Sequence, residues 1–305
     1  MKCLVTGGAG FIGSNLVDKL INNGHDVIIL DDLSTGKKEN INQKAKFYNV
    51  DISDMGVRGK CSMFEGVDTV FHTAAKARVQ PSINNPQEFN KVNVTGTLNM
   101  LKASVDYGIK RFIFSSSSSV YGNVETTPTS ETHQLNPISP YALQKLIGEQ
   151  YCKLFSELYD LETVCLRYFN VYGERQLLDG AYCLVMGVFA QQKLSGKPMT
   201  IRGDGEQRRD FTYVGDVVEA NLLASVNKEM YTNKIKCRAF NIGNGDNRSV
   251  NQIADMIGGE RINVEPVTEP KETLADNSKA NKMLGWKPTN KIENWILKYK
   301  QEIGL

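Results

Sequence analysis

KCLVTGGAGFIGSNLVDKLIN, residues 2–22, is the stretch that decides the fold class of this chain. It begins with a short apolar run typical of a buried strand and ends with the periodicity of an amphipathic helix. The turn GGAGFIG at residues 7–13 places Gly7, Gly10 and Gly13 three residues apart. Glycines permit such a turn and let backbone N–H groups approach a pyrophosphate at the positive end of the helix. The stretch therefore predicts a dinucleotide site, and the alternative is a tight turn that binds no ligand.

Apolar runs and helical stretches alternate along the first part of the chain. Near-continuous apolar strands separated by helices indicate a parallel sheet that is covered on both faces. We therefore expect the α/β class, with a doubly wound parallel sheet of the Rossmann type. The expected strands are residues 2–6, 26–30, 47–50, 69–72, 111–115 and 163–167, and the expected helices are residues 12–22, 89–107 and 141–159.

The pattern changes after about residue 172, where segments become shorter and loops carry more Gly, Pro and charge. Two later pieces, FTYVGDVVEANLLASV and AFNIGNG, keep the pattern of the first part. Because 305 residues exceed a typical single domain, we expect two interleaved domains. A dinucleotide-binding domain is expected at residues 1–172 and 211–245, and a smaller α/β substrate domain at residues 173–210 and 246–305.

The composition argues against several classes of protein. The 36 Lys and Arg residues nearly balance the 34 Asp and Glu residues, so no basic block indicates a nucleic-acid or membrane partner. The 6 cysteines and 3 histidines do not cluster, so neither a disulfide scaffold nor a metal site is expected. No apolar run approaches the length of about 18 residues that a membrane span needs. We expect a soluble, cytoplasmic protein with reduced, buried thiols.

Carboxylates follow the second and third expected strands. Asp31 and Asp32 end the second strand, where a carboxylate typically accepts from the ribose hydroxyls of a dinucleotide. A negative charge there repels a 2′-phosphate, which favours NAD over NADP. Lys37 and Lys38 argue the other way, unless they form a solvated loop pair. Asp51 suits an adenine contact, and a helix N-cap is an almost equal interpretation.

Tyr141 and Lys145 in SPYALQK are four residues apart, on one face of an expected helix. A tyrosine has an ordinary pKa of about 10 and is too weak a base at neutral pH. A nearby ammonium and a positive nicotinamide favour the phenolate, so Lys145 is expected to lower the pKa of Tyr141. Lys145 can also hold the nicotinamide ribose. The alternative is an ordinary surface pair on a helix.

The run RFIFSSSSSVYG, residues 111–122, places five serines after an apolar strand. By themselves the serines are typical of a flexible linker. In a doubly wound sheet, however, ligands bind beyond the carboxyl ends of the strands. Small hydroxyl side chains there can donate to, and accept from, a sugar hydroxyl that is being oxidised. We therefore interpret the serines as a polar pocket wall.

The motifs GGAGFIG, the serines before VYG, YxxxK, LRYFNVYG and RRDFTYVGDV occur here in one chain. Together they resemble the extended short-chain dehydrogenase/reductase family, and within it the branch of UDP-glucose 4-epimerase-like nucleotide-sugar enzymes. The resemblance extends to LADNSKANKMLGWKP near the end, so it covers essentially the whole chain. It implies a tightly held NAD that is used and regenerated within one turnover.

The resemblance implies roles for particular residues. Tyr141 resembles the catalytic base, Lys145 its partner, and Ser117 the hydroxyl partner of the sugar O4. The implied NAD contacts are Gly7, Gly10, Phe11, Ile12, Asp31, Asp32, Asp51, Ile52, Ala74, Ala75, Lys76, Asn93, Ser115, Tyr141, Lys145 and Phe169. The implied substrate contacts are Ser117, Ser118, Ser119, Tyr141, Asn170, Arg209, Thr273 and Asp276. For Arg209, the guanidinium fork fits a phosphate, and the alternative is a salt bridge to Asp210.

Three positions depart from the family pattern or bear on specificity. Family members usually carry an arginine that grips a phosphate where this chain has Pro266, and Lys271 is the nearest cation. Thr273 is small at a position where a bulky tyrosine restricts some relatives to non-acetylated sugars. We therefore expect N-acetylated UDP-hexoses to be accepted. Arg78 can meet a substrate carboxylate, although a plain surface arginine is the preferred interpretation.

The resemblance implies an epimerase that inverts C4 of a UDP-hexose, UDP-glucose or UDP-galactose, through a 4-keto sugar. The alternatives are a UDP-glucuronate epimerase or decarboxylase, a dTDP-glucose 4,6-dehydratase, and a non-catalytic NAD-binding sensor. Dehydratases and decarboxylases tend to carry an acidic residue just before VYG, where this chain has only serines. A homodimer through residues 89–107 and 141–159 is the family expectation.

Overall fold

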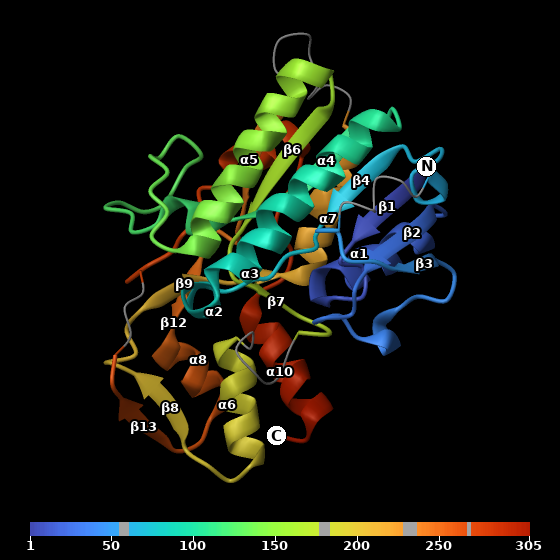
Figure 1. The fold of residues 1–305 in the computed structure, drawn as a ribbon. Helices are drawn as coiled ribbons and strands as arrows, with labels where there is room; N and C mark the ends of the chain where they lie inside the picture. Colours follow the sequence, from blue (N-terminus) through green and yellow to red (C-terminus); the bar gives the residue numbers. More distant parts are fainter. Residues whose placement is uncertain (55–60, 177–183, 228–236, 267–269) are drawn as a thin grey trace.

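The computed structural model describes residues 1–54, 61–176, 184–227, 237–266 and 270–305 (Figure 1). Its centre is a seven-stranded sheet in the order β11-β6-β5-β4-β1-β2-β3, in which every pairing is parallel. The strands are β1 (Lys2–Thr6), β2 (Asp26–Asp31), β3 (Lys46–Asn49), β4 (Thr69–His72), β5 (Arg111–Ser117), β6 (Glu162–Tyr168) and β11 (Cys237–Ile242).

The strand order confirms the doubly wound fold. The chain runs outward from β1 through β2 to β3, and then returns to the other side of β1 with β4. The order therefore switches between β1 and β4, and in such sheets the ligand crevice lies beyond the carboxyl ends of the strands at this point. The piece AFNIGNG returns to the sheet as expected, because β11 pairs with β6.

Helices cover both faces of the sheet, since successive strand residues point to opposite sides. Val5 packs on one face with α1 (Phe11–Asn22), α7 (Val214–Val226) and α9 (Ser278–Leu284). Leu4 packs on the other face, which is covered by α4 (Thr97–Asp106) and α5 (Pro140–Tyr159), as Figure 1 shows. These two apolar layers fix the sheet and therefore the position of its carboxyl edge.

The helix expected at residues 89–107 is divided into three segments. They are α3 (Pro86–Asn90), a π-helical turn η4 (Lys91–Gly96) and α4. Asn93 lies in the π-helical turn and donates to the Lys76 carbonyl and to Gln144, while it accepts from the Lys76 N–H. Such turns are frequent at functional sites, and no apolar periodicity distinguishes them from α-helix.

A second apolar cluster lies below the sheet in Figure 1. It contains Tyr172, Phe211 and Trp295 and is built from α6 (Val185–Leu194), α8 (Val250–Ile257), α10 (Ile292–Ile303) and β8 (Met199–Arg202), which pairs with β13 (Arg261–Val264). We propose that this cluster is the core of the smaller domain. Trp286 packs in the sheet cluster, so we propose that the segment around α9, expected in the substrate domain, belongs to the dinucleotide-binding domain.

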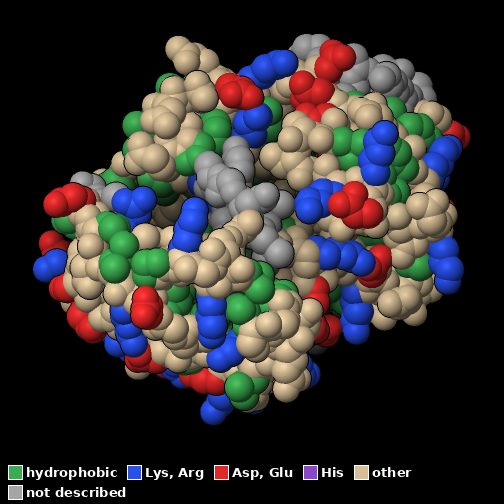
Figure 2. Space-filling view, turned by 90° about the horizontal axis from the view of Figure 1, so that it is seen from below, with side chains coloured by type: hydrophobic (Ala, Val, Ile, Leu, Met, Phe, Trp, Pro, Cys, Tyr) green, Lys and Arg blue, Asp and Glu red, His purple; other side chains and the backbone are tan. Residues whose placement is uncertain are grey.

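Short elements complete the described chain. They are η1 (Lys38–Asn40), η3 (Cys61–Met63), α2 (Val79–Asn84), η5 (Ser118–Tyr121), β7 (Val171–Tyr172), β9 (Arg208–Asp210), β10 (Thr212–Tyr213) and β12 (Asn247–Ser249). Charges of both signs are interspersed over the face drawn in Figure 2. Among the described helices, none is long and apolar enough to cross a membrane.

Four cysteines, Cys3, Cys152, Cys165 and Cys237, are free thiols. Cys3, Cys152 and Cys165 are buried, and Cys237 is half-buried. Burial raises the pKa of the Cys3 thiol to about 12, which keeps it protonated and unreactive. The expectation for Cys183 falls outside the described residues.

Candidate active site

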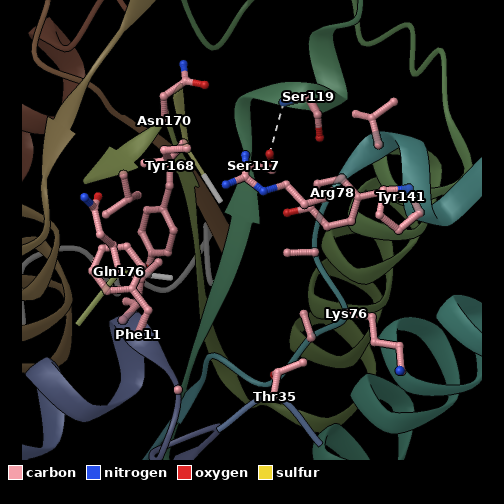
Figure 3. A pocket seen from close by; sticks show the side chains of 18 of the residues that line it. Phe11, Thr35, Lys76, Arg78, Ser117, Ser119, Tyr141, Tyr168, Asn170 and Gln176 are labelled. Carbon is pink, nitrogen blue, oxygen red and sulfur yellow. Dashed lines mark hydrogen bonds between the residues drawn. The ribbon is translucent and has the colours of Figure 1, made fainter. Parts of the chain in front are cut away.

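A cavity of about 1230 Å³ lies at the carboxyl edge of the sheet, between the sheet and the smaller cluster. Its lining begins at the glycine turn after β1, passes the serines after β5 and reaches Leu184 and Val188 of α6. Figure 3 shows Phe11 at one end of the cavity and Ser117, Tyr141 and Asn170 around the other. A dinucleotide and a second molecule would thus share one continuous space.

The glycine turn brings backbone to the cavity at close range. Gly7 has φ 70°, and a Cβ on it would lie 2.8 Å from the Ala74 Cα. A Cβ on Gly13 would overlap the Gly7 carbonyl oxygen. Gly10 is the N-cap of α1 and has no side chain to cap the helix. The N–H groups at the start of α1 are therefore left for an anionic ligand, which fits the pyrophosphate of NAD.

Asp31 supplies a fixed carboxylate beside this turn. Its side chain is 7% exposed and accepts from the Ala9 N–H at 2.9 Å and the Leu33 N–H at 2.8 Å. Burial raises the pKa of Asp31, while these two hydrogen bonds act in the opposite direction. Each oxygen keeps a further lone pair, so the carboxylate can still accept from ribose hydroxyls. Asp32 also lines the cavity but is exposed and accepts from Ser34.

The remaining nucleotide-end residues lie along the edges of β3 and β4. Asp51 and Ile52 line the cavity, and Asp51 accepts from the N–H and hydroxyl of Ser53. Burial raises the pKa of Asp51, but the hydrogen bonds from Ser53 outweigh it and the net direction is downward. Asp51 caps a turn and not a helix, because no helix begins in the described residues 52–54 that follow it, and the adenine contact stays a prediction. Ala74, Ala75 and Lys76 line the opposite side.

Tyr141 opens the other end of the cavity, in the first turn of α5. Ser139 caps this helix by accepting from the Ala142 N–H, and Pro140 occupies its first position. Burial raises the pKa of Tyr141, while a hydrogen bond with Ser117 and the charge of Arg78 lower it. The expectation that Lys145 also lowers this pKa stays a prediction.

Lys145 lies beneath Tyr141 rather than in the cavity. It is 4% exposed, and its Nζ donates to the Ser115 carbonyl at 2.7 Å. The same nitrogen is 5.9 Å from the centroid of the Tyr141 ring and 5.0 Å from that of Phe114. Burial lowers the pKa of Lys145 to about 8. In this structure the Lys145 ammonium therefore connects α5 to the end of β5.

The serine run is a wall with two layers and not a linker. Ser115 bonds Tyr168, and Ser116 donates to Glu149 at 2.5 Å, so both anchor the loop from inside. Ser117 accepts from the Ser119 N–H and starts η5, and residues 116–119 line the cavity. The buried Ser119 Oγ has no hydrogen-bond partner in the part of the chain that the structure describes. It is an available partner for a ligand hydroxyl.

A buried ion pair holds this wall in place. Arg167 donates two hydrogen bonds to the Glu149 carboxylate, at 2.9 and 2.7 Å, and a third to the Tyr121 hydroxyl. The Tyr121 hydroxyl in turn donates to Asn241 at 2.6 Å. Tyr141, Lys145 and Glu149 follow one another at four-residue steps along α5, so one helix face carries the base and its support.

The substrate end also receives residues from the second half of the chain. Asn170, at φ 23°, donates to the Asp210 carbonyl and to the Thr273 hydroxyl. The Asp210 carboxylate accepts from three backbone N–H groups, and burial raises its pKa to about 6. Asp210 therefore organises the loops, and Arg209 lines the cavity beside it.

Comparisons with known proteins decide the family. The family model described as the NAD dependent epimerase/dehydratase family matches residues 3–243. This chain belongs to that family. The UDP-glucose 4-epimerase of Thermotoga maritima, solved with UDP-glucose, is 41% identical, with a TM-score of 0.92 over 100% of both chains.

Two further solved relatives carry other names. The UDP-N-acetylglucosamine 4-epimerase of Methanobrevibacter ruminantium, solved with UDP-N-acetylmuramic acid, is 36% identical over 97% of this chain and 95% of its own, with a TM-score of 0.88. The UDP-glucuronic acid 4-epimerase of Bacillus cereus, solved with UDP-glucuronic acid and NAD, is 33% identical over 100% and 99%, with a TM-score of 0.89. This chain is thus a nucleotide-sugar epimerase, and its hexose has to be argued from the site.

Five residues expected at the site of this epimerase do not line its cavity. They are Asn93, Ser115, Lys145, Phe169 and Asp276. The first three support the lining through the hydrogen bonds described above. Phe169 is fully buried against Tyr121, because its side chain points into the core behind the loop. The Asp276 carboxylate accepts from Ser278 at the start of α9, so it caps a turn instead of facing a substrate.

Other residues line the cavity of the epimerase without having been expected there. Arg78 is half-buried in the lining, so the preferred interpretation as a plain surface arginine is wrong. Arg202 ends β8 and also lines the cavity. Its position depends on the pairing of β8 with β13, which also brings Pro266 beside Gly203. No sequence motif marks Arg202, because the approach of these two strands is a tertiary contact.

Proposed function

We propose that this epimerase inverts C4 of a UDP-hexose through a 4-keto sugar, interconverting UDP-glucose with UDP-galactose and also the N-acetylated pair. One observation carries the proposal. Ser117 and Tyr141 both line the cavity that the glycine turn opens, and the Ser117 hydroxyl lowers the pKa of Tyr141. The carboxylates among the described lining residues, Asp31, Asp32 and Asp51, all belong to the nucleotide end.

The residues of the chain divide the chemistry between them. Bound NAD supplies the two-electron redox chemistry at the sugar carbon. The ionised Tyr141 takes the proton from the O4 hydroxyl, and Ser117 keeps that oxygen aligned by hydrogen bonding. After the keto sugar has turned about its phosphate linkage, the opposite face of C4 is presented for reduction, and Tyr141 returns the proton to O4. Ser119 offers a second hydroxyl to the sugar during both steps.

The position of the acidic residues argues against elimination. A dehydratase or decarboxylase needs a group near the sugar that protonates a leaving hydroxyl or assists elimination. In the described lining, Ser117, Ser118 and Ser119 occupy that wall, and a serine hydroxyl is a poor acid. This arrangement favours epimerisation over the dehydratase and decarboxylase alternatives. The fit of a base, a hydroxyl partner and a nucleotide turn likewise favours an enzyme over a sensor.

Arginines at the substrate end suit a diphosphate. Arg209 and Arg202 both line the cavity, and a guanidinium matches a phosphate bidentately. Arg202 stands close in space to the segment that carries Pro266, where relatives usually place their arginine. We propose that Arg202 and Arg209 together bind the diphosphate, with Asn170 beside them.

The size of Thr273 supports the N-acetylated substrates. Its side chain lines the cavity, and its hydroxyl accepts from Asn170 and from the Asp210 N–H. These hydrogen bonds hold the small Thr273 side chain against the loop. The space that a tyrosine side chain would fill at this position therefore stays open to an acetamido group of the sugar. We therefore propose that the epimerase accepts both classes of UDP-hexose.

The helix α5 also supports a homodimer. Leu143, Leu154 and Leu158 are 48%, 44% and 62% exposed along this helix. Exposed leucines at such spacing form an apolar stripe that a second helix pair can cover. We propose that two copies pack through α4 and α5, and that the protein is cytoplasmic, as expected from the sequence.

The direct test incubates the purified protein, with no added cofactor, with UDP-glucose, UDP-galactose, their N-acetylated forms and UDP-glucuronate. Chromatography that resolves the C4 isomers, coupled to mass spectrometry, identifies each product. We expect isomers of unchanged mass from the plain and the N-acetylated sugars. Products that have lost water or carbon dioxide would overturn the epimerase proposal, and the absence of any product would favour the sensor.

A further inference from the structure

Arg78 stands at the sugar end of the cavity in a conformation that an arginine rarely adopts. Its φ is 95°, and it immediately precedes α2. Such backbone costs about 1–3 kcal/mol and persists only where the surroundings enforce it. Figure 3 shows its side chain reaching across the cavity beside Tyr141 toward Ser117. Strained residues cluster at functional sites, and this one carries a positive charge at the sugar end of the cavity.

The first turn of α2 is tied to Tyr141. Ser82 Oγ accepts from the Tyr141 N–H at 3.1 Å and donates to the Val79 carbonyl at 2.6 Å. Val79 is the neighbour of Arg78, so one fully buried hydroxyl connects the backbone of the arginine with that of the tyrosine. The backbone at the start of α2 is therefore fixed relative to the first turn of α5.

The charged groups around Tyr141 come from three elements. Lys145 lies on the same helix, but its Nζ points to the Ser115 carbonyl on the protein side. Lys76 precedes α2, and its Nζ pairs with Glu88 of α3 at 2.5 Å. Arg78 approaches from the cavity side, and its charge lowers the pKa of Tyr141.

The two nearest cations also differ in how they respond to pH. Burial lowers the pKa of Lys145 to about 8, so above that pH its positive charge is lost. An arginine stays protonated at every pH at which the enzyme is folded. Above about pH 8, an ionised tyrosine is therefore supported by the charge of Arg78, whereas at neutral pH both cations keep their charge.

We propose that Arg78 is the cation that stabilises the ionised form of Tyr141 on the sugar side of the cavity. This inference rests on the proposed function, since it concerns the same base. In the step concerned, Tyr141 O⁻ accepts the proton of the O4 hydroxyl, and Arg78 makes and breaks no covalent bond. Arg78 acts through Tyr141 and is a positioning residue for its charge.

The first experiment measures kcat against pH with saturating UDP-galactose for the wild type, Arg78→Gln and Arg78→Lys. The rate needs the phenolate and rises with pH, so removal of a neighbouring cation moves the rising limb upward by about 1 pH unit. Below the limb, kcat of Arg78→Gln falls roughly tenfold, and it recovers at higher pH. Arg78→Lys restores most of the shift, and the surface variant Arg261→Ala leaves the profile unchanged.

The second experiment requires no turnover. Tyrosines labelled with carbon-13 at Cζ are titrated by NMR, and the Tyr141 signal is assigned by its loss in Tyr141→Phe. We expect its midpoint to move upward by about 1 pH unit in Arg78→Gln. If the protein epimerises none of the sugars but this midpoint moves, the proposed function fails while the role of Arg78 stands.

Two results would overturn the inference. One is a Tyr141 midpoint that is the same in the wild type and in Arg78→Gln. The other is an unchanged pH profile with a raised KM for the sugar, which would make Arg78 a substrate contact. NAD content and the thermal midpoint of each variant are measured alongside, and Arg78→Ala takes the place of Arg78→Gln in both measurements if Arg78→Gln does not fold.

Discussion

At the nucleotide end of the cavity the backbone makes the site, whereas at the sugar end side chains from distant segments make it. The turn of residues 7–13 presents N–H groups and bare glycine surface within one short stretch. The sugar end combines Ser117, Tyr141, Asn170 and Thr273, which come from four separate parts of the chain. A backbone site is tolerant of side-chain change except where a Cβ intrudes, while a side-chain site depends on each residue.

The largest expected effect removes the base at the sugar end and leaves the other end intact. Tyr141→Phe deletes only the hydroxyl, so we expect kcat to fall by about 10³-fold, as for loss of a general base. The NAD content, measured by chromatography after denaturation, should stay at the wild-type level. A rate near that of the wild type would discard the assignment of Tyr141.

A substitution in the glycine turn tests the nucleotide end of the cavity. In Gly13→Ala the new Cβ overlaps the Gly7 carbonyl oxygen, so the turn has to shift at a cost of about 1–3 kcal/mol. We expect NAD affinity to fall by about 10- to 100-fold. Gly24→Ala is a control for backbone strain away from the site: its φ of 79° disfavours an alanine, but no atom lies within 4 Å of the new Cβ and Gly24 does not line the cavity. Equal NAD binding by the two variants would contradict a backbone-made site.

Substrate range tests the side-chain end more finely. Thr273→Tyr fills the space beside Asn170, so turnover of the N-acetylated UDP-hexoses should fall by roughly tenfold relative to the plain sugars. Thr273→Ser keeps the hydroxyl that accepts from Asn170 and should leave the ratio unchanged. The measurement is kcat/KM on both classes. Strict exclusion of acetylated sugars by the wild type would defeat the prediction before any variant is made.

The smallest expected effect concerns the loops that support the sugar end. Burial raises the folded-state pKa of Asp210 to about 6, against an ordinary value near 4. A raised carboxyl pKa contributes stability at low pH that is lost as pH rises through 6. Asp210 should therefore lower the free energy of unfolding by about 1 kcal/mol between pH 5 and pH 7.

Denaturant titrations at these two pH values measure the Asp210 effect. Asp210→Asn removes the titrating group, so its own loss of stability between pH 5 and pH 7 should be smaller by about this amount. Because the amide cannot accept from all three backbone N–H groups, Asp210→Asn is less stable overall, and only the difference between the two pH values is informative. An identical difference in both proteins would show that Asp210 does not titrate in this range.

Much of the site could be predicted because local sequence and chemistry coincide there. The strand–turn–helix around Gly7 and the four-residue step from Tyr141 to Lys145 are both properties of contiguous sequence. The roles of Lys145, Phe169 and Asp276 could not be derived in the same way. Whether a side chain reaches a cavity depends on its tertiary contacts. Lys145 binds the Ser115 carbonyl, Phe169 packs against the Tyr121 ring, and Asp276 accepts from Ser278 at the start of α9.

The sequence by itself determined the parallel sheet, the dinucleotide turn and the residue types of the catalytic set, because periodicity and glycine spacing are local constraints on the backbone. Only the tertiary structure decided which charges face Tyr141. The field at one atom is a sum over neighbours from the whole fold, and it depends on distance and burial. The packing of the fold places Arg78 and Arg202 in the cavity lining and Lys145 beneath the cavity.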